Sequence, residues 1–284
     1  MAQDSNSLIE QIKQNPVWSP PLENAIADIR ADRNHYQRYI TEVLTGRRRH
    51  GIIVGAPGTG KSFGISKIAK SLGLRESPRG MSGRYDYTII KGHAAPSSIY
   101  SELYHNRHPG KILILDDCAN AENDVNAMGI LNAAMDTTDS YVSWESNRLI
   151  KGTPSKFKFE GSVILVSNTF DLSVTNAKQG GIRYSRIESI TNRVHPFVVG
   201  NRDRQTVMAH IVDLVANEGV FDGDPDLNEH ALADIIIWMV ENMESFKQLS
   251  VRQLVQVVEC YKNTQQNEDW RDYANRVFVS NQEF

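Results

Sequence analysis

Cysteine is scarce in this sequence, which argues against a fold held together by disulfides or by cysteine-bound zinc. The 284 residues include two cysteines, Cys118 and Cys260, which are far apart and have no CxxC spacing. Neither a disulfide framework nor a zinc site is therefore expected. The histidines also lack metal-ligand spacing. A reducing, cytoplasmic compartment is the expected setting.

Long apolar runs and an excess of one charge are missing as well. The strongest apolar run, IIIWMV at 235–240, is far shorter than the roughly 20 residues that span a bilayer. The N-terminal segment MAQDSNSLIEQIKQ has no basic start followed by an apolar core, so neither a secretory signal nor a membrane partner is expected. The net charge of −3 argues against nucleic-acid binding through bulk charge but leaves a local basic surface open.

The order of apolar and amphipathic segments predicts an α/β core flanked by helices. Strand-like apolar runs occur at 51–54, 85–90, 112–115 and 163–166. Helical segments separate these runs, a pattern typical of a parallel sheet covered on both faces. We therefore predict an N-terminal helical extension at 1–45, with one helix at 22–44. The α/β core is predicted at 46–200. A helical domain is predicted at 201–284, because apolar residues recur there at helical spacing.

A glycine-rich loop follows the first strand. The segment GIIVGAPGTGKS runs from the apolar strand into a loop that ends in Lys-Ser, where an amphipathic helix begins. Its glycines let the backbone turn N–H groups toward a phosphate, its lysine can reach the β- and γ-phosphates, and its serine can ligate Mg²⁺. In this context the pattern favours a nucleotide-binding phosphate loop over a chance turn. The loop comprises Gly55, Ala56, Pro57, Gly58, Thr59, Gly60, Lys61 and Ser62.

A later apolar strand, KILILDDC, ends in two acids. It places Asp116 at the carboxyl edge of the predicted sheet, where ligands of parallel sheets bind. With Ser62, Asp116 would hold Mg²⁺ directly or through water, while Asp117 would orient the attacking water. In isolation the two acids could simply cap the strand. The upstream phosphate loop favours the catalytic interpretation.

The following strand, GSVILVSN, ends in Asn168. A neutral amide at this strand tip can hydrogen-bond to the γ-phosphate or the nucleophilic water without adding charge. An asparagine after a strand is more often a turn residue. The order of phosphate loop, acidic strand and polar strand tip predicts a role in the site.

These motifs resemble those of the AAA+ ATPases, over roughly residues 46–284. GAPGTGKS is similar to the Walker A motif, LILDD to Walker B, VILVSN to sensor 1 and SVRQL to sensor 2. The resemblance implies a parallel-sheet P-loop core with a C-terminal helical lid, and ATP and Mg²⁺ as cofactors. It also implies that Arg252 reaches back to the γ-phosphate. Asp117 stands where many family members have glutamate.

The family generally completes its site with an arginine from a neighbouring subunit, which implies a homo-oligomeric ring. Arg193, directly before an apolar strand, matches the usual position of this finger, and Arg186 is the second candidate. Either arginine could instead form a structural ion pair.

A long insertion separates the acidic strand from the sensor strand. The alternation YVSW, a Lys-Gly turn and the run KFKFEG predict a β-hairpin. Its position resembles the pre-sensor hairpin branch of AAA+ proteins and, distantly, the superfamily 3 helicases, where the hairpin enters a central channel. The residues that would contact a threaded strand are Trp144, Lys151, Lys156 and Lys158. The alternating Lys-Phe run also fits a half-buried strand with one solvated face.

The resemblance implies an ATP-hydrolysing motor that remodels or translocates nucleic acid, such as a helicase, a helicase loader or a replication or transposition factor. The hairpin and the double Asp favour this hypothesis. The alternative is a protein-remodelling chaperone of the complex-disassembly or cofactor-insertion type, which the acidic net charge favours. A nucleotide switch is a third option. The small size resembles phage or mobile-element proteins, which would act in the host cytoplasm.

Overall fold

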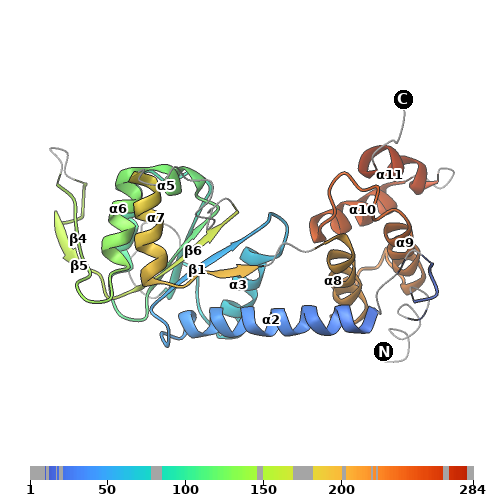
Figure 1. Ribbon diagram of the computed structural model, residues 1–284, viewed down its shortest axis with the longest axis horizontal. Coiled ribbons are helices and arrows are strands. Elements are labelled where there is room, and N and C mark those ends of the chain that lie inside the picture. Colours follow the sequence, from blue (N-terminus) through green and yellow to red (C-terminus); the bar gives the residue numbers. More distant parts are fainter. Residues whose placement is uncertain are drawn as a thin grey trace. The chain divides into compact units, whose positions relative to one another are not determined.

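The computed structural model divides into two compact units (Figure 1). It describes residues 10, 13–16, 18, 22–77, 85–145, 150–168, 182–199, 203–218, 220–221, 223–264 and 269–279. The α/β unit spans His35–Gly200, and the helical unit combines the chain up to Asn34 with the chain from Asn201 onward. Helix α2, Leu22–Leu44, has the predicted bounds and contributes residues to both units.

A five-stranded parallel sheet forms the centre of the α/β unit in the described chain. Its strands, in spatial order, are β2 (Tyr87–Lys91), β3 (Ile112–Asp116), β6 (Ser162–Ser167), β1 (His50–Gly55) and β7 (Phe197–Val199). All four neighbouring pairs are parallel. The predicted parallel α/β core is therefore confirmed, and β6 lies between the strand that enters the glycine-rich loop and the strand that ends in two acids.

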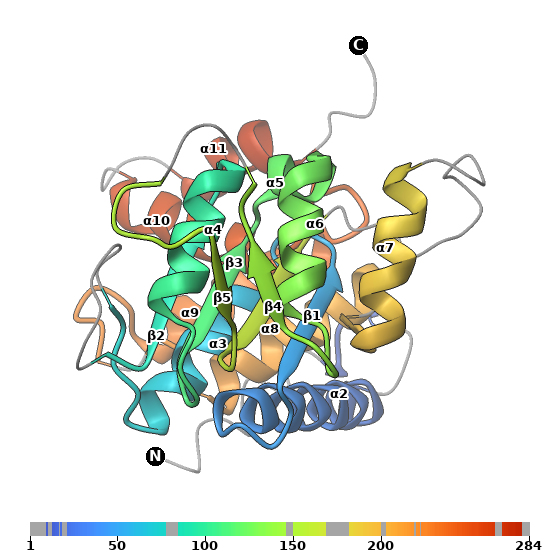
Figure 2. The same cartoon turned by 90° about the vertical axis from the view of Figure 1, so that its left-hand side faces the viewer.

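Helices cover both faces of this sheet (Figure 2). They are the part of α2 from His35 onward, α3 (Lys61–Ser71), α4 (Pro96–His105), α5 (Ala119–Asn123), α6 (Val125–Ala134) and α7 (Ile182–Arg193). Because successive strand residues point to opposite faces, Ile53 packs with α2 and α3, whereas Ile52 and Val54 pack with α4, α6 and α7. This alternation gives the sheet a separate apolar core on each side.

The predicted hairpin is present before β6. Strands β4 (Tyr141–Ser143) and β5 (Lys156–Lys158) pair antiparallel, with Val142 opposite Phe157. Both of these side chains are buried in the core that contains α4 and α6. The alternate residues of the two strands are exposed. The hairpin thus has one buried face and one solvated face.

The helical unit contains α8 (Arg204–Ala216), α9 (Glu229–Glu241), α10 (Val251–Asn263) and α11 (Trp270–Phe278). They share an apolar core with the first part of α2. A buried carboxylate joins α8 to α2, because Asp213 accepts hydrogen bonds from Arg30 at 2.9 Å and Arg33 at 2.6 Å. In the described part of the chain, no helix combines the length and apolar character needed to cross a bilayer.

Candidate nucleotide site

The chain connections change faces of the sheet between the neighbouring strands β1 and β6. These strands are neighbours, but β1 leads into α3 on one face of the sheet, whereas β6 leads on to α7 on the other face. Ligands of open parallel sheets bind where neighbouring strands connect to opposite faces. The glycine-rich loop 55–62 and Asn168 follow these two strand ends.

The glycine-rich loop has a conformation that its glycines permit. Gly58 and Gly60 have positive φ angles of 78° and 80°, which glycine adopts without steric cost. A Cβ on Gly55 would lie 2.7 Å from the carbonyl oxygen of Val199 in β7, so no larger residue fits there without a shift. Helix α3 begins at Lys61, so its free N–H groups and positive end belong to this loop.

Lys61 brings the loop and the tip of β6 together. Its Nζ donates to the carbonyl oxygens of Gly55 at 2.7 Å and Ala56 at 2.8 Å, and to Asn168 Oδ1 at 2.7 Å. The residue is buried, and this burial lowers the pKa of its ammonium group, opposed by the charges of Asp117 and Asp116. The hydrogen-bond acceptors around Lys61 in the described residues are neutral oxygens. A buried cation with neutral partners is suited to binding an anion.

Ser62 and Asp116 form a pair of oxygen ligands beside this lysine. The Ser62 hydroxyl donates to Asp116 Oδ1 at 2.6 Å, and Lys91 Nζ lies 3.8 Å from the other carboxylate oxygen, Oδ2. In the described residues no cluster of three or more His, Cys, Asp or Glu side chains could hold a metal. Mg²⁺ is usually bound by one or two carboxylates together with substrate phosphates, so this pair has the appropriate chemistry.

Asp117 has a backbone conformation that is uncommon outside glycine. Its φ is 55°, in the left-handed region, and its side chain is exposed. The Asp117 N–H donates to the carbonyl oxygen of Val166 at 2.9 Å, which ties this turn to β6. Aspartate adopts this region more readily than most residues, and such conformations often occur at functional sites.

Three side-chain contacts near the glycine-rich loop could not be predicted from any local sequence pattern. The Tyr36 hydroxyl donates to the Lys61 carbonyl oxygen, and its ring lies against Gly64. The Ser167 hydroxyl donates to Glu122 Oε2 at 2.9 Å. Lys91 approaches Asp116 because the two residues are partners in the parallel pairing of β2 and β3. These pairs are distant in sequence, and no local pattern marks them.

The predicted finger Arg193 lies outside this group of residues. Arg193 ends α7 just before β7, at the amino ends of the strands and thus at the opposite edge of the sheet from Lys61. Its Nη2 lies 3.0 Å from Asp136 Oδ2, and its Nη1 donates to the Ser189 carbonyl oxygen at 3.0 Å. Arg252 is exposed in the first turn of α10, in the helical unit. The side chain of Arg186 is outside the described residues.

The hairpin residues divide between its two faces. Lys151 is exposed in the turn, and the Lys156 ammonium lies 4.9 Å from the centre of the Tyr141 ring on the outer face. Lys158 pairs with Glu160 at 2.8 Å. Trp144 packs on Tyr100, with ring centres 5.6 Å apart. Phe157, which could also have stacked on bases, is buried against Tyr100 and Tyr104.

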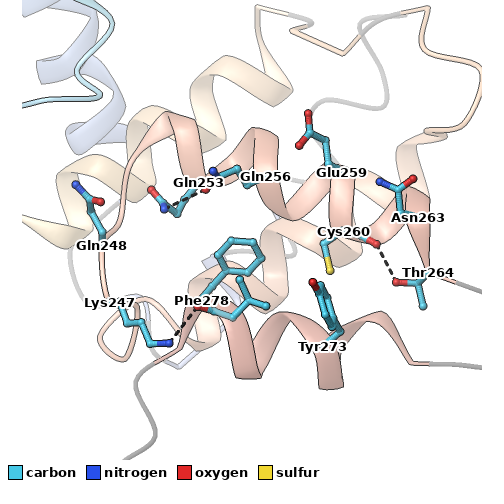
Figure 3. A pocket seen from close by; sticks show the side chains of 11 residues that line it. Lys247, Gln248, Gln253, Gln256, Glu259, Cys260, Asn263, Thr264, Tyr273 and Phe278 are labelled. Carbon is cyan, nitrogen blue, oxygen red and sulfur yellow. Dashed lines mark hydrogen bonds between the residues drawn. The ribbon is translucent and has the colours of Figure 1, made fainter.

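A separate cavity of about 670 Å³ lies between α10 and α11 of the helical unit (Figure 3). Its wall includes Gln253, Gln256, Glu259, Tyr273 and Phe278, and none of the predicted site residues lines it. Lys247 at its edge donates to the carbonyl oxygen of Val277 at 3.1 Å. The Cys260 thiol also lines the cavity, and burial raises its pKa.

Comparison with known proteins gives a phage relative without an assigned activity. No protein-family model matches the chain. A protein of Enterobacteria phage T4, described as an uncharacterized 36.7 kDa protein in the nrdC-mobD intergenic region, is 21% identical over 216 residues. The match covers 74% of this chain and 62% of the T4 protein, so the chain spans less than two thirds of that relative.

Proposed function

We propose that the protein is an oligomeric ATPase of the AAA+ type that remodels or translocates nucleic acid. The convergence of Lys61, Asp116 and Asn168 carries this proposal. Lys61 contacts Asn168, while its neighbour Ser62 contacts Asp116. The first turn of α3 thus supplies the cation Lys61 and the hydroxyl of Ser62. The ends of β3 and β6 supply the Asp116 carboxylate and the Asn168 amide. This combination fits the polyphosphate of a nucleotide.

Each residue has a defined role in this proposal. Loop N–H groups and Lys61 bind the β- and γ-phosphates, with Lys61 exchanging neutral oxygens for phosphate oxygens. Ser62 and Asp116 would hold Mg²⁺, and a bound Mg²⁺ would supply positive charge beside the transferring phosphoryl group. Asp117 orients the attacking water, and Asn168 donates a hydrogen bond to the γ-phosphate or accepts one from the water.

The left-handed turn at Asp117 supports its proposed role. An aspartate reaches less far than the glutamate common at this position in the family that the motifs resemble. The turn changes the course of the backbone at this residue, and the hydrogen bond to Val166 holds the backbone beside β6. We propose that this turn brings the shorter carboxylate within reach of the water.

The position of Arg193 supports an oligomer. It lies at the amino edge of the sheet, whereas the glycine-rich loop lies at the carboxyl edge of the same sheet. Arg193 therefore acts, in this proposal, on the nucleotide of a neighbouring subunit after leaving Asp136. Arg252 of the helical unit acts as the sensor that couples the nucleotide to domain motion.

The solvated face of the hairpin supports nucleic acid as the substrate. Lys151 and Lys156 are exposed there, and Tyr141 beside Lys156 is 48% exposed. Lysines with an accessible ring can bind phosphates and stack on bases. The similarity to a T4 protein supports action in the cytoplasm of a phage-infected cell.

The steady-state ATPase rate tests this proposal. It is measured without polymer, with single-stranded DNA, with duplex DNA and with RNA, each at two salt concentrations, using Lys61→Ala as the blank. We expect salt-sensitive stimulation by a nucleic acid that is lost when Lys151 and Lys156 are replaced together. The matched control replaces Lys67 and Lys70 of α3, a helix that packs on the opposite face of the sheet from the hairpin.

Protein remodelling is the second candidate, and two hairpin contacts favour it. Phe157 is buried, and Lys158 is neutralised by Glu160, so the hairpin offers a smaller basic face than its sequence suggests. Turnover that is indifferent to every nucleic acid would reject the first candidate in favour of a protein substrate. Absence of turnover and of ATP binding would reject both.

A further inference from the structure

An aromatic side chain is exposed beside the proposed phosphate site. Phe63 follows Ser62 directly in the first turn of α3. At 72% exposure it is the most exposed of the large hydrophobic side chains in the described part of the chain. An isolated exposed leucine or valine needs no explanation, but a phenylalanine leaves a large apolar ring in water.

The packing of α3 does not require this ring. The helix buries Lys61, Ile65 and Ala69, which recur every four residues and share the face toward the sheet. The neighbouring Gly64 is covered by the Tyr36 ring of α2. Phe63 belongs to neither contact, so its aromatic character contributes little to the fold of this helix.

The phosphate site limits where a nucleoside can lie. The loop 55–62 and the first turn of α3 would hold the polyphosphate, and the nucleoside is covalently joined to its α-phosphate. The distance from the start of α3 to the base therefore cannot exceed the length of one nucleoside. Phe63 offers an accessible apolar ring there, one residue after the proposed Mg²⁺ ligand Ser62.

We infer that Phe63 is the surface on which the base of the bound nucleotide stacks. This inference rests on the proposed nucleotide binding and adds the contact that holds the nucleoside. Stacking uses the face of a base, which every base possesses, rather than its hydrogen-bonding edge. The site therefore accepts ATP and GTP with similar affinity at this contact, and it binds both more tightly than inorganic tripolyphosphate.

Binding to the full-length protein in the presence of Mg²⁺ tests the inference. Dissociation constants for ATP, GTP and inorganic tripolyphosphate are measured by calorimetry for wild type, Phe63→Ala and Phe63→Trp. We expect Phe63→Ala to weaken both nucleotides about tenfold or more, since losing one base–aromatic stack has effects of this order. Tripolyphosphate affinity stays within about twofold, because the phosphate contacts remain. Phe63→Trp retains nucleotide affinity, and its fluorescence changes when a nucleotide binds.

The control is Tyr273→Ala, which removes another exposed ring, 61% accessible, from α11 of the helical unit. This variant is expected to bind all three ligands as wild type does. Circular dichroism establishes that each variant is folded.

Other outcomes separate the two proposals. Unchanged ATP affinity in Phe63→Ala, with binding still abolished in Lys61→Ala, would overturn the stacking role and leave nucleotide binding intact. Equal losses for ATP and tripolyphosphate would also overturn it, since they would indicate a disturbed loop. A wild-type protein that binds neither ATP nor tripolyphosphate would reject the proposed function together with this inference.

Discussion

Two buried charged residues, Asp213 in the helical unit and Lys61 in the α/β unit, have different kinds of partner. In the helical unit, the buried Asp213 carboxylate has two arginine partners, Arg30 and Arg33. In the α/β unit, the buried Lys61 ammonium donates to neutral oxygens. A buried charge compensated by ionic partners contributes to structure, whereas a charge with neutral partners is ready to interact with an incoming ligand.

A third arrangement occurs at His50, which is buried at the start of β1. Burial, aided by the charge of Arg49, lowers the pKa of this histidine to about 3, so its imidazole is neutral at physiological pH. Its Nδ1 accepts a hydrogen bond from the Val163 N–H at 3.2 Å. The buried Asp213 carboxylate is thus compensated by arginines, and the buried His50 imidazole is neutral. The buried Lys61 ammonium group has neutral hydrogen-bond acceptors.

The largest expected effect is on ATP turnover, in a variant of Arg193. Like Asp213, Arg193 forms an ion pair, but we propose that it acts in catalysis. Arg193→Ala should lower ATP turnover by about 10³-fold or more while ATP binding is retained, because the transition-state charge loses its guanidinium. Steady-state kinetics and equilibrium binding measure the two quantities. Asp136→Asn is the matched control: it breaks the ion pair but retains Arg193, so turnover should persist. Equal turnover in wild type and Arg193→Ala would show that this arginine is structural.

Asp213 should give the largest loss of stability. Asp213→Ala leaves Arg33 without its buried partner, and breaking such a pair costs about 3–5 kcal/mol of unfolding free energy. Urea denaturation followed by circular dichroism measures this loss. Glu218→Ala removes the other, more exposed carboxylate that contacts Arg33 and should cost less than about 1 kcal/mol. Similar losses in both variants would contradict the distinction between buried and accessible pairs.

His50 should make stability depend on acid pH. The unfolded histidine takes up a proton near its ordinary pKa of 6.5, whereas the folded one does so only near 3. The unfolded state therefore binds more protons between these values, and stability falls as the pH falls from 6.5 toward 3. At pH 5 the effect should be about 1–2 kcal/mol relative to pH 7. Denaturation of wild type and His50→Gln at both pH values measures it, and an equal fall in both would assign it to the carboxylates.

Lys61 should give the smallest change in stability. Lys61→Met removes a charge with neutral partners, so the unfolding free energy without nucleotide should change by less than about 1 kcal/mol. Because burial lowers its pKa, wild type should gain stability as the pH rises toward the ordinary lysine value, and the variant should lose this gain. Thermal denaturation at several alkaline pH values tests both statements. A large loss of stability in Lys61→Met at neutral pH would place Lys61 with Asp213 as a structural charge.

Local patterns predicted most of the α/β unit. Each predicted apolar run overlaps a strand, the helix at 22–44 has its predicted bounds, and the hairpin lies where its alternation indicated. Periodicity and turn composition depend on residues that are neighbours along the chain, so these elements could be predicted from the sequence. The alternation of Lys and Phe left two interpretations open, a contact surface for bases and a half-buried strand, and the structure bears out the half-buried strand, with Phe157 packed against Tyr100 and Tyr104.

The glycine-rich loop and the helix that follows it could be predicted from the sequence, because the residues that shape them are contiguous and their backbone preferences act locally. The tertiary structure, by contrast, places β6 between β1 and β3, which brings Asn168 to Lys61 across more than a hundred residues. It likewise decided that Arg193 pairs with Asp136 and that Phe63 is exposed. These outcomes depend on strand order and on the packing of distant segments, which no single stretch of sequence encodes.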